Sequence, residues 1–197
     1  EKAIKYARLH GNASVGSGGE GHDVINVLAK YGMLPEEIYS GKNMGQDKHV
    51  HGEMDEVIKA YMDAVIENPN RELTTSWAGG LEGILKAYLG EIPAEFSYKG
   101  KSYNPKSFAA SLGINLDDYI SIGSYTHHPF YSRFIIEIPD NWAWGSIYNV
   151  PLEDLSRIAN NAIDKGYTVA WAADVSEKGF SWSKGVAIVP EILPQDL

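Results

Sequence analysis

The chain of 197 residues contains no cysteine, which excludes disulfide bonds and any reaction that needs a thiol of its own. It also lacks an excess of basic residues, since 17 Lys and Arg stand against 26 Asp and Glu and the net charge is −9. This balance argues against a nucleic-acid partner, because phosphates require a positive surface. Apolar runs such as 169–173 are far too short to cross a bilayer, so we expect no membrane partner. The lack of cysteine favours the cytoplasm without excluding export, and the compartment stays open.

What the chain does contain is enough apolar sequence, 44% of its residues, to bury one good core in one domain or two small lobes. Val24, Val27, Leu28 and Tyr31 have helical spacing, which predicts a helix with one buried stripe that ends at Gly32. The same periodicity predicts two further helices, over about 51–68 and 78–89.

The second half of the chain has a different character. Its patterns predict a hairpin over 95–103, a short helix begun by Asn104-Pro105 and ended by Gly113, and a helix with an inward apolar stripe from Pro151 to Gly166. Strand-like segments, rich in β-branched and aromatic residues, occur at 119–124, 133–138, 167–175 and 185–189. Helices followed by strands predict an α+β chain with two unlike lobes, and the polar segment 40–48 is predicted to be a mobile loop.

Several sequence segments occur in the same order as in a known family. They are 16–35, which contains Gly18-Gly19, and 126–131, 137–142 and 148–152. With them the chain resembles papain-like cysteine peptidases, in particular the bleomycin hydrolase/aminopeptidase C branch. The resemblance implies an α+β papain-like fold, present in part. It assigns 1–45 to a helical lobe with the Gly-Gly loop, 46–118 to a family-specific, mostly helical insertion, and 119–197 to part of a β-rich lobe.

The chemistry implied by this resemblance is hydrolysis of peptide bonds through a thioester, with a Cys nucleophile, a His base and an orienting Asn. In the family these residues lie before the position of Glu1 and after that of Leu197. No catalytic residue is therefore assigned within this chain, which we expect to be inactive alone. The resemblance further implies a peptide substrate, no metal or organic cofactor, and a homo-oligomer. The competing hypothesis is a non-catalytic peptide-binding or structural relative.

The substrate-binding residues that the resemblance implies are Gly18, Gly19 and Trp171. A Gly-Gly pair offers a bare backbone edge with which a substrate peptide pairs as an added strand, and a side chain there would hold the substrate away. The simpler interpretation is a loop that leads into a helix. Trp171, on the predicted strand 167–175, would form the wall of a specificity pocket or belong to the core. Asp174 would bind a substrate amine or simply end the strand.

Two histidine pairs are candidate metal ligands. His49 and His51, with the nearby acids Glu53 and Asp55, would allow a metal-dependent hydrolase, but this stretch enters a predicted helix, where residues two apart face different ways. The two acids are then expected to complement the helix dipole in the first turn. His127 and His128 are adjacent, and in an extended strand they would point to opposite faces. We therefore assign no metal site from the sequence.

Overall fold

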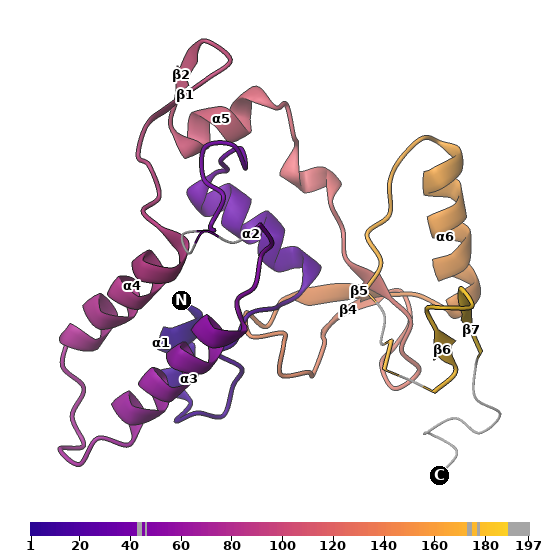
Figure 1. Ribbon diagram of the computed structural model, residues 1–197. Helices are drawn as coiled ribbons and strands as arrows, with labels where there is room; N and C mark the ends of the chain where they lie inside the picture. The colour runs from indigo at the N-terminus through magenta and orange to yellow at the C-terminus, as the bar shows by residue number, and fades with distance from the viewer. Residues whose placement is uncertain (43–44, 46, 173–174, 177, 189–197) are drawn as a thin grey trace. The chain divides into compact units, whose positions relative to one another are not determined.

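The computed structural model describes residues 1–42, 45, 47–172, 175–176 and 178–188 (Figure 1). The chain divides into two compact units, 1–155 and 156–197, which are described separately below. Within the described residues, no helix has both the length and the apolar character that a membrane span requires. The three-part division of the sequence at 45 and 118 remains a prediction.

The apolar core of the first unit lies between three helices. Helix α1 (Lys2–Arg8) packs against α3 (Gly52–Ile66), which packs against α4 (Ser76–Leu89) (Figure 1). The core is made of buried side chains from α1 and α3, namely Ala3, Tyr6, Ala7, Met54, Ile58 and Met62. The helices predicted at 51–68 and 78–89 are confirmed as α3 and α4. Helix α1 was not predicted from the sequence.

Helix α2 (Gly21–Tyr31) confirms the predicted helix and its end at Gly32. The φ of Gly32 is +84°, and an added Cβ would lie 2.3 Å from the backbone of Pro105, so only glycine fits there. The predicted burial of the stripe is wrong, because Val24, Val27 and Tyr31 are 62%, 48% and 53% exposed. Periodicity specifies an apolar face, but it does not specify which surface covers that face.

The segment after α4 folds as predicted. Strands β1 (Phe96–Tyr98) and β2 (Lys101–Tyr103) form an antiparallel hairpin, and Lys99 and Gly100 turn it with φ of +50° and +76°. Helix α5 (Pro105–Ser111) begins at Asn104, whose side-chain oxygen accepts a hydrogen bond from the Ser107 amide at 2.8 Å. The ring of the buried Phe108 contacts three aromatic rings of the hairpin, those of Phe96, Tyr98 and Tyr103.

A three-stranded sheet follows the short 3₁₀ helix Leu116–Asp118. Its strands are β3 (Ile122–Gly123), β4 (Ser132–Ile135) and β5 (Ser146–Asn149), in the order β3-β5-β4. The middle strand pairs parallel with β3 and antiparallel with β4. Strands predicted at 119–124 and 133–138 are confirmed in shorter form, whereas the central strand β5 was not predicted.

Helix α6 (Leu152–Asp164) crosses from the first unit into the second, and Gly166 follows it with φ +84°. The predicted helix is confirmed, but its inward stripe is wrong, because Leu152, Ile158 and Ile163 are exposed. The strand predicted at 167–175 is also wrong for the residues described there, which have no regular secondary structure. The second unit instead has a short hairpin of β6 (Phe180–Ser181) and β7 (Val186–Ala187). The strand predicted at 185–189 contains β7, and Val189 lies outside the described residues.

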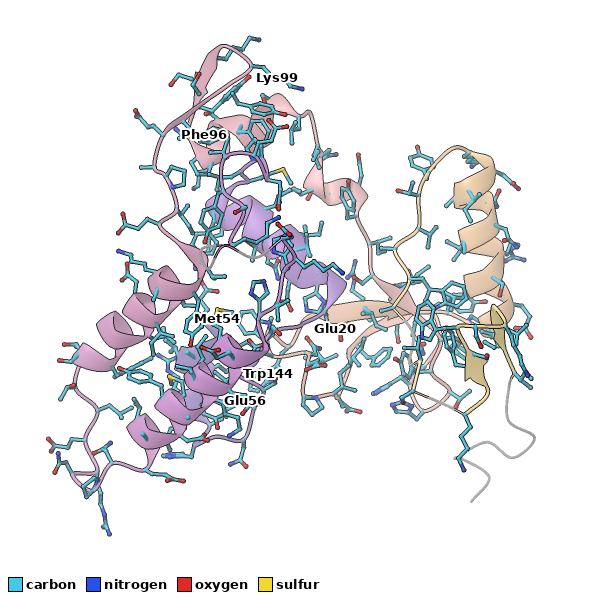
Figure 2. All side chains as sticks on the ribbon, viewed as in Figure 1. Glu20, Met54, Glu56, Phe96, Lys99 and Trp144 are labelled. Carbon is cyan, nitrogen blue, oxygen red and sulfur yellow. The ribbon has the colours of Figure 1, made fainter. Side chains whose placement is uncertain are left out.

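The contribution of the α1–α3–α4 core to stability is testable at Met54, which is buried in α3 (Figure 2). We expect Met54→Ala to lower the free energy of unfolding by about 2–5 kcal/mol, because the core loses contacts and gains a cavity. Glu56→Ala, at an exposed position of the same helix, is the matched control and should change it by less than about 0.5 kcal/mol. Urea denaturation followed by circular dichroism measures both. Equal effects would contradict this location of the core.

A second prediction concerns the hydrogen bond from the Tyr6 hydroxyl to Asp63, which joins α1 to α3. Hydrogen bonds from Lys59 and Tyr6 lower the pKa of Asp63, and the bond to Asp63 raises the pKa of Tyr6. The Asp63 contribution is therefore present above the ordinary carboxyl pKa of about 3.9 and is lost as pH falls through the lowered value. The Tyr6 contribution is present below the ordinary phenol pKa of about 10 and is lost as pH rises through the raised value.

We accordingly expect Tyr6→Phe to lower the melting temperature most near neutral pH. The difference from the unmodified chain should shrink in strong acid and in strong alkali, and a melting-temperature profile against pH measures it. Tyr119→Phe, at an exposed tyrosine, is the control and should leave the profile unchanged. A Tyr6→Phe effect that is the same at every pH would rule out the linkage to Asp63.

Candidate functional site

The loop between α1 and α2 holds the predicted Gly-Gly pair. Gly18 and Gly19 are exposed and have φ of +103° and +153°, a region that favours glycine. A Cβ at Gly18 would meet open space, whereas one at Gly19 would lie 2.5 Å from Oδ2 of Asp23 and 3.4 Å from Nε1 of Trp142. The backbone of the pair is thus accessible, and glycine is needed at Gly19 both for its dihedral and for its close neighbours.

Polar contacts from two helices, α1 and α3, hold this loop in place. The Lys2 ammonium donates to the carbonyl oxygens of Gly16 and Gly18 at 2.7 and 3.0 Å. The Ser17 hydroxyl and amide donate to the Asp55 carboxylate of α3 at 2.6 and 3.2 Å. In the described part of the chain, no hydrogen bond joins the amide or the carbonyl of Gly19 to another residue. The Gly19 peptide groups therefore form an exposed edge with free hydrogen-bonding capacity on an anchored loop.

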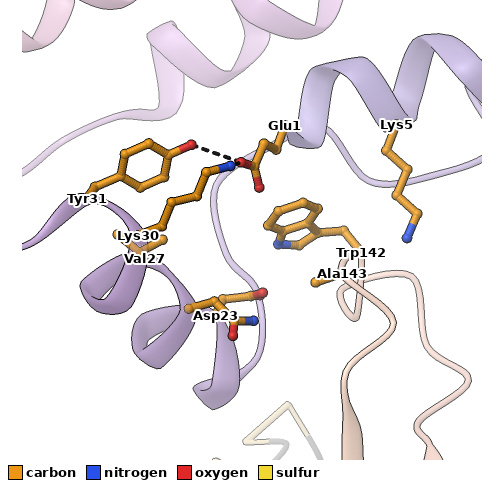
Figure 3. Close-up of a pocket in the computed structure, with 9 residues that line it drawn as sticks. Glu1, Lys5, Asp23, Val27, Lys30, Tyr31, Trp142 and Ala143 are labelled. Carbon is orange, nitrogen blue, oxygen red and sulfur yellow. Dashed lines mark hydrogen bonds and ion pairs between the residues drawn. The ribbon is translucent and has the colours of Figure 1, made fainter. Parts of the chain in front are cut away.

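A hollow of about 270 Å³ adjoins this loop (Figure 3). Its lining comes from α1, from α2 and from the 142–143 segment, and it includes Asp23 and Trp142, the two side chains nearest to Gly19. On its α1 side, the Glu1 carboxylate accepts a hydrogen bond from the Tyr31 hydroxyl at 2.9 Å and forms an ion pair with Lys30. The hollow thus combines apolar surface with charges of both signs beside the exposed backbone edge.

Two side chains at the start of α2 carry buried polar atoms that sequence reasoning did not single out as a pair. Both imidazole nitrogens of His22 and the Oδ1 atom of Asp23 are buried and have no hydrogen-bond partner among the described residues. His22 lies against Gly145, where an added Cβ would be 2.1 Å from its Nε2 atom. The other carboxylate oxygen of Asp23 accepts a hydrogen bond from the Glu20 amide at 2.9 Å. Asp23 therefore shapes the loop at Gly19 directly.

The third residue predicted to bind substrate, Trp171, is 88% exposed and has no regular secondary structure around it. The predicted strand that was to orient it is absent from the residues described in that segment, and Asp174 lies outside the described residues. Trp171 belongs to the 156–197 unit. Its role in a specificity pocket remains a prediction.

The His49 and His51 pair has the surroundings expected for a structural role. Nε2 of His49 lies 3.2 Å from the Glu36 carboxylate, whose pKa is lowered first by Lys42 and also by His49. Glu53 and Asp55 lie in the first turn of α3, as predicted. Both acids have other partners, because Glu53 accepts from the Tyr88 hydroxyl and Asp55 accepts from Ser17.

The His127 and His128 pair differs from the expectation in its backbone. These residues lie in a turn between β3 and β4, not in an extended strand, and their ring centroids are 4.4 Å apart. Both imidazoles face the carboxylate of Glu137, with Nε2 to Oε2 distances of 3.8 and 3.6 Å. The structure therefore brings together three potential metal ligands that the sequence had separated.

Comparison with solved structures bears on the fold. The chain is similar in structure to PepW from Lactobacillus rhamnosis HN001, with a TM-score of 0.61 and 15% sequence identity. The similarity covers 84% of this chain and 46% of PepW, so the chain spans less than half of that protein. No protein-family model matches the sequence, and no curated protein matches it. The predicted α+β class with a papain-like fold is thereby confirmed, at the level of the fold alone.

Proposed function

We propose that this chain is part of a cysteine-type peptidase of the bleomycin hydrolase/aminopeptidase C kind, with its catalytic Cys, His and Asn outside residues 1–197. The observation that carries the proposal is the exposed Gly18-Gly19 edge on a papain-like fold, where no described residue forms a hydrogen bond with the amide or carbonyl of Gly19. The complete protein would hydrolyse peptide bonds without a metal or organic cofactor, as a homo-oligomer. A cytoplasmic location is the favoured one.

The proposed role of the loop is to hold a substrate peptide in an extended conformation. A peptide that approaches Gly19 as an added strand can accept from its amide and donate to its carbonyl, two bonds that do not depend on the substrate sequence. The Gly18 carbonyl already accepts from Lys2, so pairing would be concentrated at Gly19. The hollow beside Asp23 and Trp142 is then the place for a neighbouring substrate side chain, and Trp171 remains a further candidate for side-chain recognition.

In this mechanism, the loop contributes alignment rather than chemistry. A thiolate attacks the peptide carbonyl, its His partner protonates the leaving amine, and water then hydrolyses the thioester. Pairing with Gly19 would hold the scissile carbonyl at a fixed place relative to that thiolate, which lowers the entropic part of the barrier. The alternative function is a non-catalytic peptide-binding or structural module, in which the same edge binds a peptide that is not cleaved.

A first test separates these two functions. Because no thiol exists in residues 1–197, we expect the purified chain to show neither peptide hydrolysis nor labelling by a Cys-directed epoxide. The product of the complete reading frame should show both, with the label on a cysteine outside this region. Covalent labelling of the 197-residue chain itself would contradict the proposal. A complete protein that binds peptides but is never labelled would establish the non-catalytic alternative.

A second test addresses the edge directly. In the complete protein, we expect Gly19→Val to reduce kcat/KM for a peptide at least tenfold, equivalent to about 1.4 kcal/mol, because the side chain obstructs the approaching strand. The nucleophile should still react with a small alkylating agent that needs no strand pairing. Gly16→Ala is the matched control, since it lies in the same loop, has no positive φ and has open space around its Cβ position.

The melting temperature must be measured beside the kinetics, because Gly19→Val also meets Asp23 and an unfavourable dihedral. If that variant fails to fold, Gly18→Ala is the gentler probe, because its Cβ meets no neighbour and only the φ of +103° disfavours alanine. Unchanged peptide turnover in a folded variant would reduce the pair to a helix-entry loop.

A further inference from the structure

We propose that His127, His128 and Glu137 form a binding site for a divalent transition metal ion, with Zn²⁺ as the ion that best fits the ligand set. The two histidines lie in the turn after β3, and Glu137 follows β4, so both segments belong to the same sheet region. This proposal differs from the sequence analysis, which assigned no metal site.

The distances between the potential ligand atoms are close to those in a metal site. Zn²⁺ binds His nitrogen and carboxylate oxygen at about 2.0–2.2 Å, so tetrahedral ligands stand about 3.4 Å from one another. Nε2 of His127 and Nε2 of His128 lie 3.8 and 3.6 Å from Oε2 of Glu137. All three ligand atoms lie within 4.8 Å of one another. The two distances to Glu137 exceed that spacing by only a few tenths of an ångström, and the exposed Glu137 side chain can take up this difference.

The turn that carries the histidines is held from beneath by a buried side chain. Asn149 of β5 is 0% exposed, and its amide nitrogen donates to the carbonyl oxygens of Tyr125, His128 and Pro129 at 2.9, 3.0 and 3.2 Å. The ring of Phe134 stacks on His128 with a centroid distance of 4.1 Å. The imidazole of His128 is therefore oriented before any ion binds, which reduces the entropic cost of binding.

A second observation concerns the ring nitrogen of His128 that faces Glu137 at 3.6 Å, a distance too long for a hydrogen bond. The Nε2 atom of His128 is buried and has no hydrogen-bond partner among the described residues. Buried polar side-chain atoms in proteins almost always have a partner. A metal ion placed between this nitrogen and the Glu137 carboxylate would satisfy it, and would also bring together the exposed His127 and Glu137 side chains.

The ligand types determine which ions the site would select. Imidazole nitrogen suits Zn²⁺, Cu²⁺, Ni²⁺ and Fe²⁺, whereas Mg²⁺ and Ca²⁺ prefer oxygen ligands throughout. Three protein ligands leave a fourth position of a tetrahedral ion to water. A bound ion would join the turn at 127–128 to the segment after β4, so it would stabilise this part of the sheet by mass action.

The test uses the metal-free 197-residue chain titrated with Zn²⁺ and with Co²⁺. We expect one ion per chain, a rise in melting temperature with Zn²⁺, and the visible spectrum of tetrahedral Co²⁺. Glu137→Gln, at a side chain that is 70% exposed, should weaken binding at least tenfold without loss of fold, and the double variant His127→Ala, His128→Ala should abolish it. The matched control is His49→Ala, His51→Ala, which alters the other histidine pair and should leave binding unchanged.

A second readout does not depend on the variants folding. Cu²⁺ with ascorbate oxidises the histidines that bind the ion, and mass spectrometry then maps the modified residues. We expect oxidation concentrated at His127 and His128, with little at the exposed His10 and His49. Three results would each overturn the proposal. They are oxidation spread over all exposed histidines, a dissociation constant for Zn²⁺ weaker than about 1 mM, and loss of binding only in the His49 and His51 control.

Discussion

The buried amide of Asn149 is the contact on which the sheet region depends. It lies on the middle strand, where its side-chain oxygen accepts from the Tyr125 amide at 2.9 Å and its nitrogen serves the carbonyls of Tyr125, His128 and Pro129. One side chain thus supplies hydrogen-bond partners to four backbone groups of the segment 125–129, which lies between strands β3 and β4. Because an unpaired buried polar group costs about 1–3 kcal/mol, a hydrophobic residue of similar size could not replace it. The orientation of the imidazole of His128 follows from this anchoring.

Asn141 repeats the same arrangement in the loop before β5. It is buried, its side-chain nitrogen donates to the carbonyl oxygens of Ile136 and Gly145, and its oxygen accepts from the Gly145 amide at 2.9 Å. This fixes the chain on both sides of Trp142, which lines the hollow beside the Gly18-Gly19 loop. It also holds Gly145 against His22 at the start of α2. Buried asparagine side chains therefore fix the backbone of these irregular segments, as hydrogen bonds between strands fix the backbone of a sheet.

The sequence predicted those elements whose signals are local. Apolar periodicity identified α3 and α4, the latter with Gly90 at its end, and Lys99-Gly100 and Asn104-Pro105 identified the hairpin and α5. Strand β5 was missed because only Ile147 and Tyr148 of its four residues favour strands, and because both of its partner strands are distant in sequence. The Gly18-Gly19 loop was likewise recognised in place, but its positive φ angles and the contact with Asp23 are visible only in the structure.

The histidine cluster shows the same limit for a site. Treating His127 and His128 as an extended pair placed their rings on opposite faces, because the pattern of nearby residues contains no sign of Asn149, which lies 21 residues beyond His128 and turns the backbone. Glu137 completes the cluster only through the return of the chain along β4. Ligand sets assembled across a sheet cannot be deduced from sequence spacing alone.

The apolar surface is distributed unevenly over helices that carry the same kind of pattern. Helix α3 buries Met54, Ile58 and Met62 in the α1–α3–α4 core, whereas α2 leaves Val24 and Val27 exposed. Each large apolar side chain that stays exposed forgoes about 1.5–3 kcal/mol of burial. Helix α2 must therefore depend more on its ends, where Asp23 accepts from the Glu20 amide and Gly32 closes the last turn. Asp23 also limits the space at Gly19. The hydrogen bond between the Glu20 amide and Asp23 at the start of α2 therefore also shapes the exposed backbone at Gly18-Gly19.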